Sequence, residues 1–322
     1  MNRIIAVVLT LMAFTAKDVA KLREQTGAGM MDCKKALNET NGNMDEAVEF
    51  LRKNGQAKAE KKASRIAAEG LCMVVTKDDQ TAAVVEVNSE TDFVAKNATF
   101  QEFVKAVATQ AVNSDAADMD AFMAEKWNED ASKTVSEALV EKVAVIGENL
   151  KIRRFEKVVA ERGCVVPYVH GGGRIGVIVD ADTDVVNDTV KEAMHNIAMQ
   201  IAALNPKYVS RDEVSADYIA HEKEILLAQI MNDPKESQKP EKVINGMIEG
   251  RISKELKEVC LVDQVYVKAE DGKQTVAKYL DEVSKAVGCT VKVKRFVRFE
   301  TGEGLEKKQE DFAAEVAAQM NA

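Results

Sequence analysis

Four residues near the middle of the chain have the composition of a catalytic turn. The run from His170 to Gly173 reads HGGG, as in the oxyanion turn of some esterases. An esterase of that kind also needs a nucleophile elbow, GxSxG, and the sequence contains none. The competing interpretation is a glycine turn that joins strands at residues 165–169 and 174–179. We expect the glycine turn and keep the esterase-like enzyme as a rival.

Other residue types that often do chemistry are dispersed. No P-loop pattern occurs, His195 and His221 fall in helical patterns without an evident partner, and the five cysteines form no C-x-x-C pair. Asp180, Asp182 and Asp184 alternate as in a calcium loop, but the glycine and terminal glutamate of an EF-hand are missing. We expect Asp184 to cap the helix that follows it. The sequence predicts no metal or cofactor site and favours a protein that works by binding.

The stretch EVNSETDFVAK, from Glu86 to Lys96, combines a valine-rich strand with a polar break. Thr91 and Asp92 are capping residues, and Phe93 follows them at the start of the next helix. An aromatic residue at this place either staples its own helix or projects into a partner protein. These residues alone favour the staple.

The composition is that of an ordinary folded chain with room for two or three domains: 322 residues, 46% hydrophobic and 30% charged. The net charge of −9 argues against a nucleic-acid-binding surface over the whole protein. The apolar run at residues 4–14 is too short to span a bilayer. It reads either as a weak signal-peptide core or as sequence upstream of a start at Met12. We favour the start at Met12, because the scattered cysteines are typical of a cytoplasmic protein.

Three short helical patterns occupy residues 15–55. Thr15 and Asp18 have the spacing of a capping box, and the third helix is expected to end at Gly55. A bundle of this size either binds other proteins or serves as a structural cap. Residues 56–70 are rich in alanine, lysine and glutamate and predict a solvated helical linker.

The remainder of the chain contains a duplication. Two sequence segments resemble two later segments of the chain. Residues 85–94 match 177–186 at an offset of 92, and residues 134–155 match 275–296 at an offset of 141. We therefore expect an α+β core of two copies with antiparallel sheets, at about 71–162 and 163–300. In this alignment the second copy keeps Thr183 and Asp184, but it has Val185 where the first copy has Phe93.

The offsets of 92 and 141 differ by 49 residues, so the second copy carries an insertion. Two amphipathic stretches at about 211–258, separated by the segment from Pro234 to Pro240, predict an antiparallel helical hairpin. Its apolar positions must pack on the return helix or on another chain, which leaves a homodimer open. Residues 301–322 predict a polar turn and a terminal helix, whose Phe312 and Val316 dock on the core or on a partner.

Several blocks of the chain resemble the elongation factor Ts family. They are TGAGMMDCKKAL (26–37), EVNSETDFVAKN (86–97), IGENLKIRR (146–154), HGGGRIGV (170–177), FVRFETGEGLEKK (296–308) and DFAAEVAAQ (311–319). The resemblance runs in family order from about residue 16 to the end. It implies an α+β cytoplasmic protein with a ubiquitin-associated-like three-helix bundle, a duplicated core, a coiled-coil arm and a C-terminal helical module.

The same resemblance implies a guanine nucleotide exchange factor that binds elongation factor Tu with GDP, without catalytic residues, a cofactor, or a nucleic-acid or membrane partner of its own. In the family, a Thr-Asp-Phe-Val segment enters the GTPase and disturbs its Mg²⁺ site. Here those residues are Thr91, Asp92, Phe93 and Val94. Further contacts map to Lys34, Ile146, Gly147, His170 and Val267, and to the terminal helix around Phe312 and Val316.

One departure from the family pattern lies beside Val267, where Lys268 replaces an apolar residue that is often found there. The alternative function is an interaction scaffold that binds a GTPase without exchanging its nucleotide.

Overall fold

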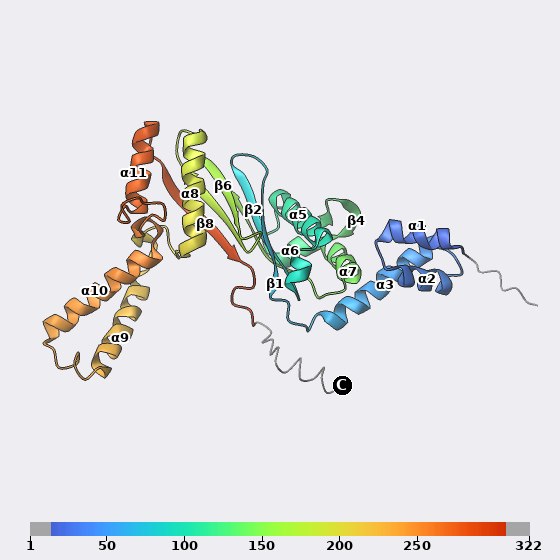
Figure 1. Cartoon of the computed structure of the whole chain (residues 1–322), viewed down its shortest axis with the longest axis horizontal. Coiled ribbons are helices and arrows are strands. Elements are labelled where there is room, and N and C mark those ends of the chain that lie inside the picture. Colours follow the sequence, from blue (N-terminus) through green and yellow to red (C-terminus); the bar gives the residue numbers. More distant parts are fainter. Residues whose placement is uncertain (1–13, 307–322) are drawn as a thin grey trace, which may run out of the picture.

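The computed structural model describes residues 14–306. This part of the chain is elongated, with a three-helix bundle at one end, a helical hairpin at the other and an α+β core between them (Figure 1). The predicted α+β class, with antiparallel sheets and an inserted hairpin, is confirmed. The predicted N-terminal extension, apart from Phe14, and the predicted terminal helix with Phe312 and Val316 lie outside the described residues.

The bundle consists of α1 (Ala16–Thr26), α2 (Met30–Glu39) and α3 (Met44–Lys62). The capping box that the spacing predicts is present, because the Thr15 hydroxyl accepts from the Asp18 N–H and the Asp18 carboxylate accepts from the Thr15 N–H. Leu22 and Leu37 are fully buried in the small apolar core between the helices. An apolar core of this size gives the bundle little stability of its own, so packing on the rest of the protein is expected to stabilise it.

The prediction that the third helix ends at Gly55 is wrong. Helix α3 continues to Lys62 and passes so close to α7 (Val135–Ile146) that a Cβ on Gly55 would lie 3.4 Å from the Cβ of Ala144. A glycine inside a helix costs only about 1 kcal/mol relative to alanine, and packing outweighs that cost. Part of the predicted linker is therefore the same helix, and it joins the bundle to the core.

Each copy of the core has a three-stranded antiparallel sheet. The first is ordered β1 (Glu69–Thr76), β2 (Thr81–Ser89), β5 (Lys151–Val159), and the second β6 (Cys164–His170), β7 (Ile175–Asp182), β8 (Lys292–Glu300). The first copy also contains α4 (Asp92–Ala95), α5 (Ala98–Asn113), α6 (Met119–Ala124) and a small hairpin of β3 (Lys126–Trp127) and β4 (Asp130–Thr134). The second contains α8 (Asp188–Leu204), η1 (Arg211–Glu213), η2 (Leu261–Asp263) and α11 (Val276–Val287).

The core is a stack of four layers: helices, sheet, sheet, helices. Figure 1 shows α5 and α8 on opposite sides of the strands. The inner faces of the two sheets meet around Val84, Ile178 and Phe299, which are buried together. The alternation along β2 explains this arrangement, because Val85 and Val87 face the helices of the first copy instead. Each sheet thus packs against helices on one face and against the other sheet on its second face.

The duplication is confirmed in detail. Helix α11 and strand β8 begin and end 141 residues after α7 and β5. The buried positions of α8 repeat those of α5 at an offset of 90, including the buried polar pair Gln110 and Gln200. Each glutamine bonds the backbone of the segment that leads to the next helix, at Lys126 O and Asn128 N–H in the first copy. Gln200 makes the same two bonds 139 residues later in the second copy.

The predicted hairpin is formed by α9 (Ala216–Asn232) and α10 (Glu241–Val259), and its tip includes Pro234 and Pro240. Ile230 is fully buried, and Ile244, Ile248 and Ile252 of the return helix are buried in the same cluster. No helix within residues 14–306 is both long and apolar enough to cross a membrane.

Candidate protein-binding site

Phe93 lies on α4, a single helical turn directly after β2, and is 80% exposed. Thr91 is the N-cap of this turn, with its hydroxyl accepting from the Val94 N–H at 3.3 Å. Asp92 is exposed and pairs with Lys96 at 2.6 Å. Val94 is partly buried against the apolar core of the first copy. The helix-staple interpretation of Phe93 is therefore wrong, because its ring extends away from its own protein.

The structure brings Ile146 and Gly147 next to this turn. Helix α7 ends at Ile146, and Gly147 follows as its left-handed C-cap with φ +89°. The next residue, Glu148, accepts hydrogen bonds from the backbone and hydroxyl of Thr91. Two of the predicted contact segments, 91–94 and 146–147, are thus connected through Glu148.

The other described residues of the predicted set lie elsewhere along the molecule. Lys34 is exposed on α2, His170 is exposed at the end of β6, and Val267 is 47% exposed in the segment before α11. The His170 Nδ1 lies 2.9 Å from the hydroxyl of Tyr168. The Val267 N–H donates to the buried Gln200 at 2.7 Å, so its backbone is held while its side chain points outward.

The glycine-turn interpretation of HGGG is confirmed. Gly171, Gly172 and Gly173 connect β6 to β7 with φ of +59°, +65° and +102°, which glycine adopts at little cost. A Cβ on Gly173 would lie 2.6 Å from Leu71 Cδ2, and the Cys72 N–H donates to the Gly173 carbonyl at 2.6 Å. The run therefore lets the turn of one sheet approach the first strand of the other.

The sequence alignment of the two strand ends is out of register by two residues. Glu86 pairs with Arg154 across β2 and β5, and Asp180 pairs with Arg295 across β7 and β8. This places Glu86 and Asp180 at equivalent positions, an offset of 94 in place of the predicted 92.

Thr183 therefore corresponds to Ser89 and not to Thr91. Both hydroxyls donate to the carbonyl two residues further on, at 3.0 Å for Ser89 and 3.4 Å for Thr183. The prediction that Asp184 caps the next helix is also wrong. Asn187 caps α8, while Asp184 pairs with Arg162 at 3.1 Å.

Helix α4 is an insertion in the first copy. Asn97 caps α5 in the way that Asn187 caps α8. Asn97 lies eleven positions after Glu86, whereas Asn187 lies seven positions after Asp180. The four additional residues equal the length of α4. Phe93 thus has no counterpart in the second copy, and the capping role predicted for both copies exists only in the first.

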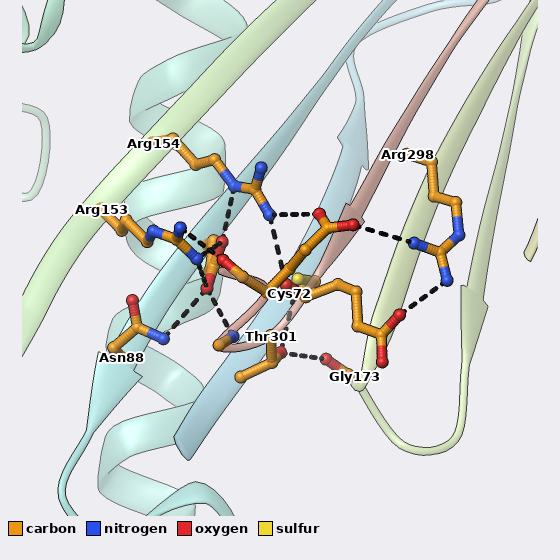
Figure 2. Close-up of polar contacts among 11 residues, drawn as sticks. Cys72, Asn88, Arg153, Arg154, Gly173, Arg298 and Thr301 are labelled. Atoms are coloured by element: carbon orange, nitrogen blue, oxygen red, sulfur yellow. Dashed lines mark hydrogen bonds and ion pairs between the residues drawn. The ribbon is translucent and has the colours of Figure 1, made fainter. Parts of the chain in front are cut away.

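Sequence reasoning missed a buried ionic network centred on Glu86, which is fully buried (Figure 2). Its carboxylate accepts from the Gly302 N–H at 2.8 Å, Arg153 at 3.0 Å and Arg154 at 2.6 Å. A bulge in the β2–β5 pairing lets the two adjacent arginines reach the same carboxylate. Burial raises the pKa of Glu86, but the hydrogen bonds from Gly302, Asn88 and Arg153 outweigh it, so the pKa lies below its ordinary value.

The same network ties down the turn that leads to the C-terminal segment. Arg153 donates to the Glu303 carbonyl at 2.6 Å, and Thr301 donates to the Gly173 carbonyl at 3.3 Å (Figure 2). Burial raises the pKa of the Cys72 thiol, beside Thr301, to about 12. A single glutamate inside the valine run VVEVN was the available signal, since a buried carboxylate requires cationic or N–H partners.

Comparison with known proteins identifies the family. The family described as Elongation factor TS matches residues 90–303. The elongation factor Ts of Clostridioides difficile (strain 630) is 52% identical over 307 residues, which cover 95% of this chain and 98% of that protein. The elongation factor Ts of Clostridium novyi (strain NT) is 50% identical over 308 residues, covering 95% and 99%. This chain belongs to the elongation factor Ts family.

Proposed function

We propose that this protein is a cytoplasmic guanine nucleotide exchange factor that binds elongation factor Tu with GDP and promotes GDP release during translation elongation. The observation that carries the proposal is Phe93, a large apolar side chain that is 80% exposed on a short helix whose ends are held. An exposed aromatic residue on a rigid support is typical of a residue that contributes strongly to binding.

The mechanism follows from the thermodynamics of linked binding. A GTPase holds GDP through phosphate contacts and a bound Mg²⁺. An exchange factor must bind the nucleotide-free state more tightly than the loaded state, and the nucleotide then weakens the factor to the same extent. In this proposal Phe93 enters the GTPase and disturbs the Mg²⁺ and phosphate site, while Asp92 accepts hydrogen bonds at the contact. Thr91 and Val94 hold the turn from within.

Several further contacts are part of the proposal. They are Lys34 on the bundle, Ile146 and Gly147 beside α4, His170 on the glycine turn, Val267 before α11, and Phe312 and Val316 in the C-terminal module. The exposure of Lys34, His170 and Val267 supports this assignment. The hairpin exposes Leu227, Met231 and Val243, which supports its pairing with the GTPase or with a second copy.

Stopped-flow release of a fluorescent GDP from elongation factor Tu tests the proposal. Phe93→Ala should slow GDP release about thirtyfold, because loss of a central aromatic anchor typically costs about 2 kcal/mol. The free energy of unfolding should stay within about 0.5 kcal/mol, since the side chain is mostly exposed. Val186→Ala is the matched control, an exposed apolar residue in the corresponding loop of the second copy.

The scaffold alternative predicts a different pair of results. The wild-type protein would then capture the GTPase in a pull-down without accelerating GDP release. A wild-type rate of release with Phe93→Ala, in an otherwise active factor, would contradict the role of Phe93 alone.

A further inference from the structure

Two glutamates connect the α4 turn to the end of α7, because the carboxylate of each accepts hydrogen bonds from backbone N–H groups of the other segment. The Glu148 carboxylate accepts from the N–H groups of Glu90 and Thr91, at 3.0 and 3.1 Å, and from the Thr91 hydroxyl at 2.7 Å. In return, the Glu90 carboxylate accepts from the Asn149 N–H at 2.6 Å and pairs with Arg65 at 3.4 Å. We call Glu90 and Glu148 the carboxylate clamp.

The α4 turn requires such support from outside. A helix of four residues does not form on its own, because fixing the first turn costs more than its single hydrogen bonds return. Its cap is also dependent: the Thr91 hydroxyl that accepts from Val94 donates its own proton to Glu148. The charged carboxylate thus orients the cap while it accepts from two backbone N–H groups.

The second copy provides an internal comparison. At the offset of 141 that relates α7 to α11, Glu148 corresponds to Cys289. The Cys289 thiol lies 3.7 Å from the Thr183 hydroxyl and 4.0 Å from Asp184, both weak contacts. A carboxylate therefore stands at this position in the copy that carries the inserted helix, and a thiol stands there in the copy that lacks it.

The base of the clamp is connected to the bundle. Lys62, the last residue of α3, donates to the Gly147 carbonyl at 2.6 Å, and the Arg65 carbonyl accepts from the Asn149 side chain at 2.8 Å. Backbone and side chain on both sides of Glu148 are thereby held. The carboxylate is fixed in place before a partner arrives, so little ordering cost remains at binding.

We propose that Glu148 is the positioning residue of the exchange site: it holds the N-terminal end of α4 and so sets the direction of Phe93. The inference rests on the proposed exchange function. It assigns to Glu148 no contact with the partner. Its effect on exchange therefore passes through Phe93, which distinguishes it from a residue that merely stabilises the fold.

The experiment compares Glu148→Ala with Glu137→Ala in the full chain. Glu137 lies at the opposite end of α7, where it accepts from the Thr134 N–H at 2.8 Å and pairs with Arg52 at 3.1 Å. Glu137 lies in the first turn of α7 and Glu148 lies just beyond its C-cap, so each variant removes a carboxylate at one end of this helix, but only Glu148 contacts the α4 turn. The measurements are the saturating rate of GDP release from elongation factor Tu, the free energy of unfolding, and hydrogen exchange at residues 90–96.

Glu148→Ala should raise amide exchange across the α4 turn and slow GDP release roughly tenfold, the size expected for losing charge-assisted hydrogen bonds. Glu137→Ala should leave both unchanged. In a Phe93→Ala background, Glu148→Ala should slow release no further, because both changes remove the same contact. Glu148→Gln, which keeps an acceptor oxygen, should recover part of the rate.

Two results would overturn the inference: a wild-type release rate and amide exchange in Glu148→Ala, or losses in Glu148→Ala and Phe93→Ala that simply multiply. Failure of the proposed function is separately visible, since the wild-type factor would then not accelerate GDP release. In that case amide exchange at residues 90–96 still decides whether Glu148 holds α4.

Discussion

The first copy of the core carries a four-residue helix between β2 and α5, whereas the second carries a long hairpin between α8 and α11. The frame around these additions is the same in both copies. Gln110 and Gln200 bond equivalent backbone groups, and Gly147 and Gly288 end equivalent helices in the left-handed conformation. Insertions at loops cost little closure entropy, so the repeated fold can carry a different inserted element in each copy.

The two copies also treat one equivalent buried carboxylate differently. Glu86 accepts from two arginines, an asparagine and a backbone N–H. Asp180 is similarly buried, but Arg295 lies 3.5 Å away, and within residues 14–306 its Oδ1 accepts no hydrogen bond. Burial raises the pKa of Asp180, which the Arg295 charge only partly offsets. At neutral pH the charged Glu86 carboxylate therefore stabilises the folded state, whereas the charged Asp180 carboxylate destabilises it.

The largest expected effect is on stability. Glu86→Ala should lower the free energy of unfolding at pH 7 by about 3–5 kcal/mol, because it removes the buried carboxylate that two arginines and the Gly302 N–H share as an acceptor. Asp180→Asn should change it by less than about 1 kcal/mol, since the carboxylate has few partners to lose. Urea unfolding of both variants measures the difference, and equal losses would contradict the comparison.

Glu86 and Asp180 should also affect the pH dependence of the free energy of unfolding in opposite directions. The folded pKa of Glu86 lies below its ordinary 4.5, so its contribution is present above about that pH and is lost as the pH falls through the folded value. The folded pKa of Asp180 lies above its ordinary 3.8, so acidification relieves a cost and adds stability. Glu86→Gln should flatten the acid loss of stability, and Asp180→Asn should steepen it.

The next effect is on exchange, and it tests whether α4 is a separable insertion. Replacing residues 90–97 by the four-residue sequence of 184–187, DVVN, gives the first copy the loop of the second. Apart from the four residues of α4, the variant should keep its helix content, because α8 starts from that loop. It should lose at least about thirtyfold in GDP release, the equivalent of losing a strong anchor. Circular dichroism and the fluorescent GDP assay measure these outcomes, and retained exchange would contradict the role of α4.

The smallest effect tests the shared frame. Gln110→Ala and Gln200→Ala should each lower the free energy of unfolding by about 1 kcal/mol, because each removes two hydrogen bonds to partly buried backbone groups. The two losses should be similar and should add in the double variant, since the glutamines share no partner. Thermal or urea unfolding provides the values. Markedly unequal losses would indicate that the two copies are less alike than their hydrogen bonds suggest.

Much of the fold was predictable from local patterns. The capping box at Thr15, the turn at His170–Gly173 and the hairpin tip between Pro234 and Pro240 all lie where the sequence predicts them. Each depends on residues within a few positions of one another, and propensity and spacing report on such neighbours.

The errors share a physical cause. Gly55 continues its helix because α7 packs against it, and Asp184 leaves the capping role to Asn187 because Arg162 pairs with it. The two-residue slip in the strand alignment arises because the period of a strand is two, so a shifted alignment keeps every valine on the correct face. Only the pairing of Glu86 with Arg154 and of Asp180 with Arg295 reveals the true register.

The amino-acid sequence by itself determined the order of the elements, the duplication, the hairpin insertion and the family blocks, because these depend on local periodicity and on repeated sequence segments. The tertiary structure alone decided that Phe93 extends outward, that α4 has no counterpart, that Glu148 accepts from Thr91, and that Glu86 accepts from the Gly302 N–H. Those contacts join residues 57 and 216 positions apart. Hydrogen bonds over such separations depend on how sheets and helices pack, and no pattern of neighbouring residues specifies them.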